Sequence, residues 1–273
     1  MRPYPRREAF RNYGTSFVLD ADAAAYIARW SVTPPASIQV IINDLVLGLK
    51  ADGPWNLQEL LTAPFLLQPT IADACLNLKS TLYVPSFVNS PTLVDGEGIL
   101  FNGSTNYVRS GFAPSISSLF APTSNHFMNW ITAGGTGADT NKRSGSCDST
   151  NANATAVFGL HSASSPRTNN NQAAQVPGSL SGATRLGMTT GNQSATTARQ
   201  IYRDGVSIGT SAITGSTRTT RETYIGAFNN NGAVTGFCDN TYSSWGAGGS
   251  MNAAQHLACF NRMTAAKAAI AVL

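Results

Sequence analysis

Charged side chains are scarce in this sequence of 273 residues. Asp, Glu, Lys and Arg make up 12% of the residues, about half of the usual share of roughly 25%. Asn, Ser, Thr and Gly take their place, mainly after Gly134, as is typical of extracellular β proteins with a polar, uncharged surface. The net charge of +4 arises largely near the N-terminus, from Arg2, Arg6, Arg7 and Arg11.

Targeting and membrane segments are also missing. No apolar run reaches the ~18 residues that a membrane helix needs. The N-terminal segment is basic but lacks the apolar stretch of a signal peptide. We therefore expect no membrane insertion, and nothing in the sequence predicts a nucleic-acid partner.

Cysteine and histidine are too few and too dispersed for a metal centre. No Cys-x-x-Cys pair occurs, and His256 with Cys259 could supply only two of the four ligands of a zinc site. We expect no metal and no cofactor. The four cysteines are expected to be buried or free thiols, with a Cys147–Cys238 bridge between two loops as the alternative: Cys75, Cys147, Cys238 and Cys259.

What the sequence does contain is a strong hairpin signal. Asp204-Gly205 separates two short alternating runs, and a type I′ turn needs positive φ at both central residues. A third run, residues 223–228, predicts an antiparallel meander that must bury one face. Upstream, short apolar runs are separated by Gly, Asn and Pro turns, which favours an all-β sandwich: residues 87–88, 92–94, 99–101, 107–108, 127–131, 155–160 and 184–188.

Two stretches resemble a known fold family. Tyr-Arg-Asp-Gly-Val at 202–206 followed by Tyr-Ile-Gly-Ala at 224–227, together with residues 99–108, is similar to concanavalin A-like (LamG-like) jelly rolls. The resemblance covers about residues 84–273 and implies a lectin-like, mainly β fold. The short C-terminal segment and the N-terminal segment resemble those of bacteriophage tail or fibre proteins.

The N-terminal region has its own organisation. Residues 1–19 predict an extended basic arm, with a disordered tail as the alternative. Residues 20–82 predict a small helical attachment unit, and residues 83–273 predict the sandwich with short C-terminal helices. Within the helical unit we expect helices at 21–30, 38–50, 55–67 and 69–77; Asp20, Ser37 and Ser250 are the expected N-caps of the first helix, the second helix and a C-terminal helix at 251–263.

Enzyme motifs are absent. Concanavalin A-like glucanases carry Glu-x-Asp-x-x-Glu on one strand, because retaining hydrolysis needs two carboxylates ~5 Å apart. The predicted β region has only two glutamates, Glu97 and Glu222, and neither has a partner acid at that spacing. We therefore predict that the protein is not an enzyme, with a divergent glycoside hydrolase as the least favoured alternative.

A polar loop cluster has the chemistry of a glycan site, because amides and carboxylates bind sugar hydroxyls while an aromatic face stacks on the ring. The alternative is structural: Asn-rich stretches commonly form turns, and core packing is the stronger interpretation of Trp245. The candidates are Asn229, Asn230, Asp239, Tyr242 and Trp245, with Asn231 and Asn240 beside them.

Together these features predict a structural virion protein of a tailed bacteriophage, in a tail fibre, tail tip or head fibre. The lectin-like domain would bind host-surface polysaccharide. The arm and helices would attach it to other virion proteins, and a homo-oligomer is expected, with a trimer as one form. Localisation in the virion follows from an extracellular type of surface without a signal segment. A cytoplasmic protein and a cellular glycan-binding module are the alternatives.

Overall fold

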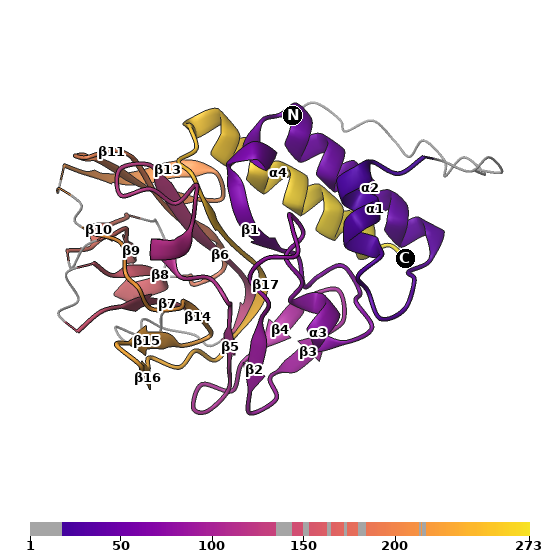
Figure 1. Cartoon of the computed structure of the whole chain (residues 1–273), viewed down its shortest axis with the longest axis horizontal. Helices are drawn as coiled ribbons and strands as arrows, with labels where there is room; N and C mark the ends of the chain where they lie inside the picture. The colour runs from indigo at the N-terminus through magenta and orange to yellow at the C-terminus, as the bar shows by residue number, and fades with distance from the viewer. Residues whose placement is uncertain are drawn as a thin grey trace.

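The computed structural model describes residues 18–134, 144–149, 153–162, 165–171, 174–179, 184–212, 214 and 217–273. Within these residues two antiparallel sheets face each other, and helices cover the outer face of one of them (Figure 1). The predicted mainly β, concanavalin A-like antiparallel sandwich is therefore confirmed. Of the predicted arm, residues 1–17 lie outside the described residues.

The first sheet, sheet A, contains eight described strands in the order β13-β12-β11-β6-β17-β4-β3, with β1 paired to β17. Strand β17 lies at its centre, between β6 on one side and β4 and β1 on the other. The strands are β1 (Gln58–Thr62), β3 (Thr92–Val94), β4 (Gly98–Leu100), β6 (Asn125–Gly134), β11 (Gly187–Ala195), β12 (Ala198–Arg203), β13 (Val206–Ser211) and β17 (Asn240–Gly248).

The second sheet, sheet B, has nine described strands in the order β10-β9-β8-β7-β14-β5-β2, with β15 beside β7 and β16 beside β15. The β15–β7 pair is parallel, unlike the other described pairs. The strands are β2 (Ser86–Val88), β5 (Tyr107–Arg109), β7 (Ser144–Cys147), β8 (Thr155–Ser162), β9 (Ser165–Asn169), β10 (Val176–Pro177), β14 (Tyr224–Ile225), β15 (Phe228–Asn230) and β16 (Ala233–Thr235).

The predicted hairpin forms, but the predicted meander does not. Asp204 and Gly205 have φ values of 52° and 78°, as a type I′ turn requires. A Cβ on Gly205 would lie 2.6 Å from the Cα of Leu257, so this turn packs directly on the backbone of the C-terminal helix. Residues 224–225 leave sheet A and pair with β5 and β7 in sheet B. The meander prediction was wrong because β13 and β14 belong to different sheets.

The helices begin partly where the sequence predicts. Asp20 caps α1 (Ala21–Ile27) by accepting a hydrogen bond from the amide of Asp22, as expected. The predicted serine caps are wrong. Helix α2 (Ala36–Ala51) follows Pro35, and α4 (Ala253–Ile270) is one continuous helix capped by Asn252 in a capping box with Gln255.

The predicted third helix is also wrong. Residues 55–67 instead form the short 3-10 helix η1 (Pro54–Leu57) and strand β1, which pairs with β17. The segment Gln-Glu-Leu-Leu-Thr suits a helix locally, yet the partner strand, about 180 residues later, determines its conformation. A short α3 (Ile71–Ala74) lies within the predicted 69–77 helix.

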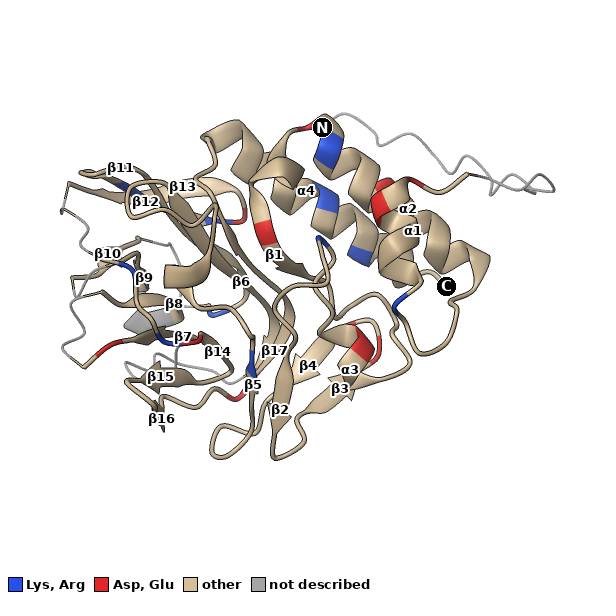
Figure 2. Ribbon diagram, viewed as in Figure 1, with Lys and Arg blue, Asp and Glu red and all other residues tan. Residues whose placement is uncertain are grey.

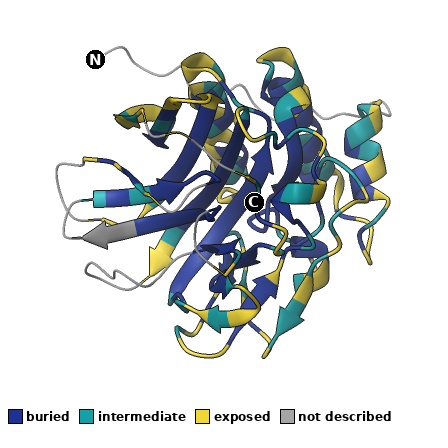
Figure 3. Cartoon of the chain, turned by 60° about the vertical axis from the view of Figure 1, so that its left-hand side comes forward, coloured by how far each residue is buried: buried dark blue, intermediate teal, exposed yellow. Residues whose placement is uncertain are grey.

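One apolar core joins the helices to sheet A. Helices α1, α2 and α4 share it with Met128, Trp130 and Met188, which point from sheet A toward the helices. The rings of Phe65 and Trp130 meet edge to face at 5.8 Å. The long central strands are buried, whereas exposed residues gather on loops and outer helix faces (Figure 3). The helical segment therefore buries its apolar face on its own sandwich.

A second core lies between the sheets and includes Phe127, Ile131, Val157, Trp245 and Ala247. The four cysteines are buried as thiols, and no disulfide forms among the described residues. Cys147 donates to the side-chain oxygen of Asn230 at 3.2 Å instead of bridging to Cys238. Charged residues are few and scattered over the ribbon (Figure 2), as the composition predicts.

Candidate functional site

The structure separates the predicted site residues into three environments. Asn229 and Asn230 end β15, and Asn231 follows in the turn to β16. Asp239 lies just before β17, and Tyr242 and Trp245 lie within β17.

The two predicted stacking rings are in the core. Tyr242 is 2% and Trp245 1% exposed. Tyr242 packs edge to face against Phe101 at 5.4 Å and donates its hydroxyl to the sulfur of Cys238. Strand β17 is paired on both sides and covered on both faces, which buries all nine of its residues. Neither ring can therefore stack on a sugar, and this part of the prediction is corrected.

Asp239 lies apart from the asparagine loop and pairs with Arg185. Its carboxylate pairs with Arg185 at 3.0 Å, and its Cβ packs beside Gly103, where an added Cβ would come within 3.1 Å. Asn240, which follows it, is buried. The asparagine loop and Asp239 therefore do not form one site.

The asparagine loop instead meets residues that the sequence did not connect to it. The guanidinium of Arg221 donates through Nε and Nη2 to the side-chain oxygen of Asn231, at 3.1 and 2.7 Å. Asp148 accepts from the hydroxyls of Thr219 and Thr220 at 3.0 and 3.1 Å, and Asn153 donates to its other oxygen. We call this group the Asp148 platform: Asp148, Asn153, Thr219, Thr220, Arg221 and Asn231.

Hydrogen bonds to Asp148 hold the platform together, and three of its residues are exposed. Burial raises the pKa of Asp148, but hydrogen bonds from Asn153, Thr219 and Thr220 outweigh it, so its pKa lies below the usual value. The carboxylate therefore stays charged and holds three segments together. Thr220, Arg221 and Asn231 are exposed above it. They present a hydroxyl, a guanidinium and an amide to solvent.

Two buried tyrosines of sheet B lie beside Arg109. The rings of Tyr107 and Tyr224 lie 4.8 Å apart, and Arg109 stands directly opposite Tyr224 in the strand register. Arg109 pairs with Glu222 at 2.9 Å, and Glu222 also accepts from the amide of Gly111 at 2.6 Å. No sequence signal marks the Asp148 platform, because Asp148 lies about 70 residues before the two threonines that donate hydrogen bonds to it.

A second surface is hollowed where α4 begins. This α4 hollow has a volume of about 480 Å³ and opens on the helix side of sheet A. Its polar lining comes from β11, β12 and the segment that caps α4: Ser194, Gln200, Tyr202, Ser250, Asn252 and Gln255. The sequence gives no signal for it, because the lining residues come from three separate segments.

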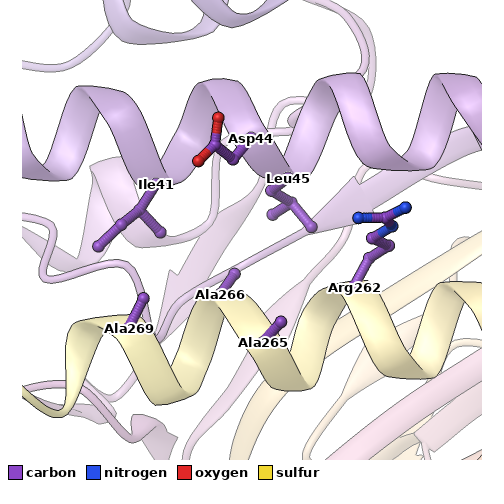
Figure 4. A pocket seen from close by; sticks show the side chains of 7 residues that line it. All are labelled: Ile41, Asp44, Leu45, Arg262, Ala265, Ala266 and Ala269. Carbon is purple, nitrogen blue, oxygen red and sulfur yellow. The ribbon is translucent and has the colours of Figure 1, made fainter. Parts of the chain in front are cut away.

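A third depression, of about 260 Å³, lies between α2 and α4 (Figure 4). Its walls are mostly aliphatic and offer few groups that could bind a polar ligand: Ile41, Asp44, Leu45, Arg262, Ala265, Ala266 and Ala269. Where Arg262 crosses Gly48, an added Cβ would come within 2.6 Å of the arginine side chain, so the two helices pack tightly there.

The buried and half-buried carboxylates of the described residues are held by donors. Glu59 accepts from Tyr83, from Ser117 and from the amides of Ser118 and Leu119. Burial raises its pKa, but these hydrogen bonds outweigh burial and leave the pKa below its usual value. The pKa of Asp73 is lowered in the same way by Ser31 and Thr70. A general acid for glycoside hydrolysis needs the opposite shift.

Neither a metal site nor a membrane-spanning helix is found among the described residues. Among the described residues, no group of three or more His, Cys, Asp or Glu could hold a metal ion. No described helix is both long and apolar enough to span a bilayer.

Comparison with known proteins adds the fold but no family. No protein-family model matches the chain, and a search of curated proteins gives no match. Among solved structures, the chain is similar to domain 4 of AbnA, an extracellular GH43 arabinanase from Geobacillus stearothermophilus, in complex with arabinotriose. The TM-score is 0.50 with 9% identity over 74% of this chain and 97% of that one.

Two botulinum neurotoxin structures are also similar. The serotype D binding domain gives a TM-score of 0.51 with 6% identity, over 76% of this chain and 52% of that chain. The second is a structure of botulinum neurotoxin type C, whose cell entry depends on interaction with two ganglioside molecules. It gives a TM-score of 0.53 with 12% identity, over 77% of this chain and 52% of that chain. The chain thus spans about half the length of each toxin structure. Because these proteins include both an enzyme's domain and a toxin's binding domain, the non-enzyme prediction stays a prediction, and the shared feature is a lectin-like β-sandwich.

Proposed function

We propose that this protein is a carbohydrate-binding module and that the Asp148 platform is its binding surface. The observation that carries the proposal is the arrangement of Thr220, Arg221 and Asn231 above the carboxylate of Asp148, whose two oxygens already accept hydrogen bonds. Sugar recognition needs several hydrogen-bonding groups of mixed type held in place before the ligand arrives, because ordering them on binding costs affinity. Fold likeness to a domain whose structure is in complex with arabinotriose supports the same class of ligand.

In the proposal, the three asparagines of the loop have different roles, although the sequence suggested that they would act together. Asn231 is the exposed contact, whereas Asn229 is buried and supports the turn by accepting from the amide of Gly232 at 2.7 Å. Asn230 is half-buried and holds Cys147.

The test is a glycan array probed with the full chain and with two arginine variants. Arg221→Ala removes the guanidinium that bridges the platform, and we expect binding to fall at least tenfold. Arg262→Ala is the matched control, because its side chain is 44% exposed against 45% for Arg221 and it too has a carboxylate partner. Equal binding by all three proteins, or no binding to any glycan, would rule the platform out.

The biological setting we propose is the surface of a bacteriophage particle, where the module would attach the particle to host polysaccharide. The charge-poor composition and the basic N-terminal segment support it. The helices do not need a partner to cover their apolar face, since α4 and sheet A cover it. The attachment role therefore falls on the arm. Deleting residues 1–17 should leave folding intact and abolish incorporation into particles, and normal incorporation would contradict this assignment.

A further inference from the structure

The α4 hollow is built from groups that are already fixed by one another. The side chain of Asn252 accepts from the amide of Gln255 at 2.9 Å, and the side-chain oxygen of Gln255 accepts from the amide of Asn252 at 2.9 Å. The amide of Met251 donates to Asn192 at 2.9 Å, and Ser250 shares a hydrogen bond with Ser124 at 2.9 Å. The wall that carries Ser250 and Asn252 is therefore anchored to β11 and to Ser124, the residue before β6.

The opposite wall is an aromatic side chain with an amide beside it. Tyr202 donates its hydroxyl to Gln200, and both side chains point to the helix side of sheet A. The ring of Tyr202 stacks on His256 at 3.9 Å with planes 23° apart. His256 is 1% exposed, and its two ring nitrogens have no hydrogen-bond partner in the part of the chain that the structure describes. Burial lowers the pKa of His256 to about 3, so the group behind Tyr202 is uncharged near neutral pH.

The chemistry of the lining selects the class of ligand. No side chain in the lining of the hollow carries a charge, so a charged ligand would lose water without gaining an ionic partner. Hydroxyls and side-chain amides both donate and accept, as sugar hydroxyls do. The amide of Gln255 donates to the Asn252 cap, so the amides of Ala253 and Ala254 are the ones at this end that can donate to a neutral oxygen.

We propose that the α4 hollow is a second carbohydrate site, which takes one neutral pyranose residue of an oligosaccharide. Its volume lies within the range of small-molecule sites, roughly 300–1,000 Å³. The hollow lies on the helix side of sheet A, whereas the Asp148 platform lies on sheet B. The two sites use different residues, so the inference does not depend on the platform.

The experiment uses two neighbouring alanines of α4. Ala253 lines the hollow and is exposed, so Ala253→Trp fills the space without disturbing the core. Ala254 is also exposed and is not in the lining of the hollow, which makes Ala254→Trp the matched control. Side-chain amide signals of Gln200 and Gln255 are followed by NMR while neutral hexoses, N-acetylhexosamines and their oligosaccharides are added.

We expect a neutral sugar to shift both amide signals in the wild type and in Ala254→Trp. Ala253→Trp should weaken that response at least tenfold. Arg221→Ala should leave it unchanged, which separates this site from the platform. Absence of any shift with neutral sugars would overturn the proposal, as would an Ala253→Trp protein that responds like the wild type. Shifts produced by inorganic sulfate or phosphate alone would assign the hollow to anions and would overturn it as well.

Discussion

The two halves of sheet A present different surfaces to sheet B. Strands β6 and β17 contribute Phe127, Ile131 and Trp245 to an apolar core. On β11 and β12, the strand register places the polar residues Thr189, Arg199 and Arg203 on the same side, together with Ile201. The hydroxyl of Thr189 and two guanidinium nitrogens of Arg199 are buried and have no hydrogen-bond partner among the described residues. The apolar half therefore provides stability, whereas each unpaired group in the polar half costs about 1–3 kcal/mol.

The largest effect should come from the apolar half. Trp245→Ala should lower the free energy of unfolding by about 3–5 kcal/mol, because it leaves a cavity between the sheets at a fully buried position. Urea denaturation measures the change. A loss below about 1 kcal/mol would mean that the space collapses and that this half is not the stabilising one.

Acid should act next, at the contact between α4 and sheet A. Burial lowers the pKa of His126 to about 4 and that of His256 to about 3, from an ordinary value of 6.5. As pH falls, the unfolded chain binds these protons first, so stability is full above about pH 6.5 and declines toward the folded-state values. His126 alone accounts for about 3 kcal/mol of this loss.

The variant His256→Phe isolates one of the two histidines, because a phenyl ring keeps the stacking on Tyr202 and cannot be protonated. The midpoint temperature of thermal unfolding should fall less steeply between pH 7 and pH 4 in this variant than in the wild type. An unchanged slope would assign the acid sensitivity to other groups.

Variants of two buried arginines in the polar half of sheet A should change stability by smaller amounts. Burial lowers the pKa of Arg199 and of Arg203 to about 10. Arg203 donates to the carbonyls of Arg185, Leu186 and Gly159, so Arg203→Met should destabilise the fold by about 2–3 kcal/mol. Arg199 donates only to Gln193 among the described residues, so Arg199→Met should be neutral or stabilising by up to ~1 kcal/mol. Equal destabilisation by both variants, measured by urea denaturation, would show that the polar half is paired in solution.

The sequence predicted local features and missed those set by distant partners. The Asp204-Gly205 turn and the Asp20 cap depend on neighbouring backbone, so their residue types sufficed. Strand β1 failed because pairing with β17 overrides helix propensity. Trp245 lies on a strand buried on both faces, so alternation could not show whether its ring faced solvent.

The same limit applies to the candidate site. The Asn229–Asn231 turn was predictable from composition, but the group that organises it was not. Asp148 reaches Thr219 and Thr220 only because β7 pairs with β14 and β15 in the folded sheet. A single sequence records no such contact.

The most direct measurement is an NMR titration of the full chain with the oligosaccharide that binds best on the array. If the Asp148 platform is the binding surface, the Nε–H signal of Arg221 and the side-chain amide of Asn231 shift together as the ligand is added, while the Nε–H of Arg262 stays in place. Saturable binding that leaves both platform signals unmoved would contradict the account.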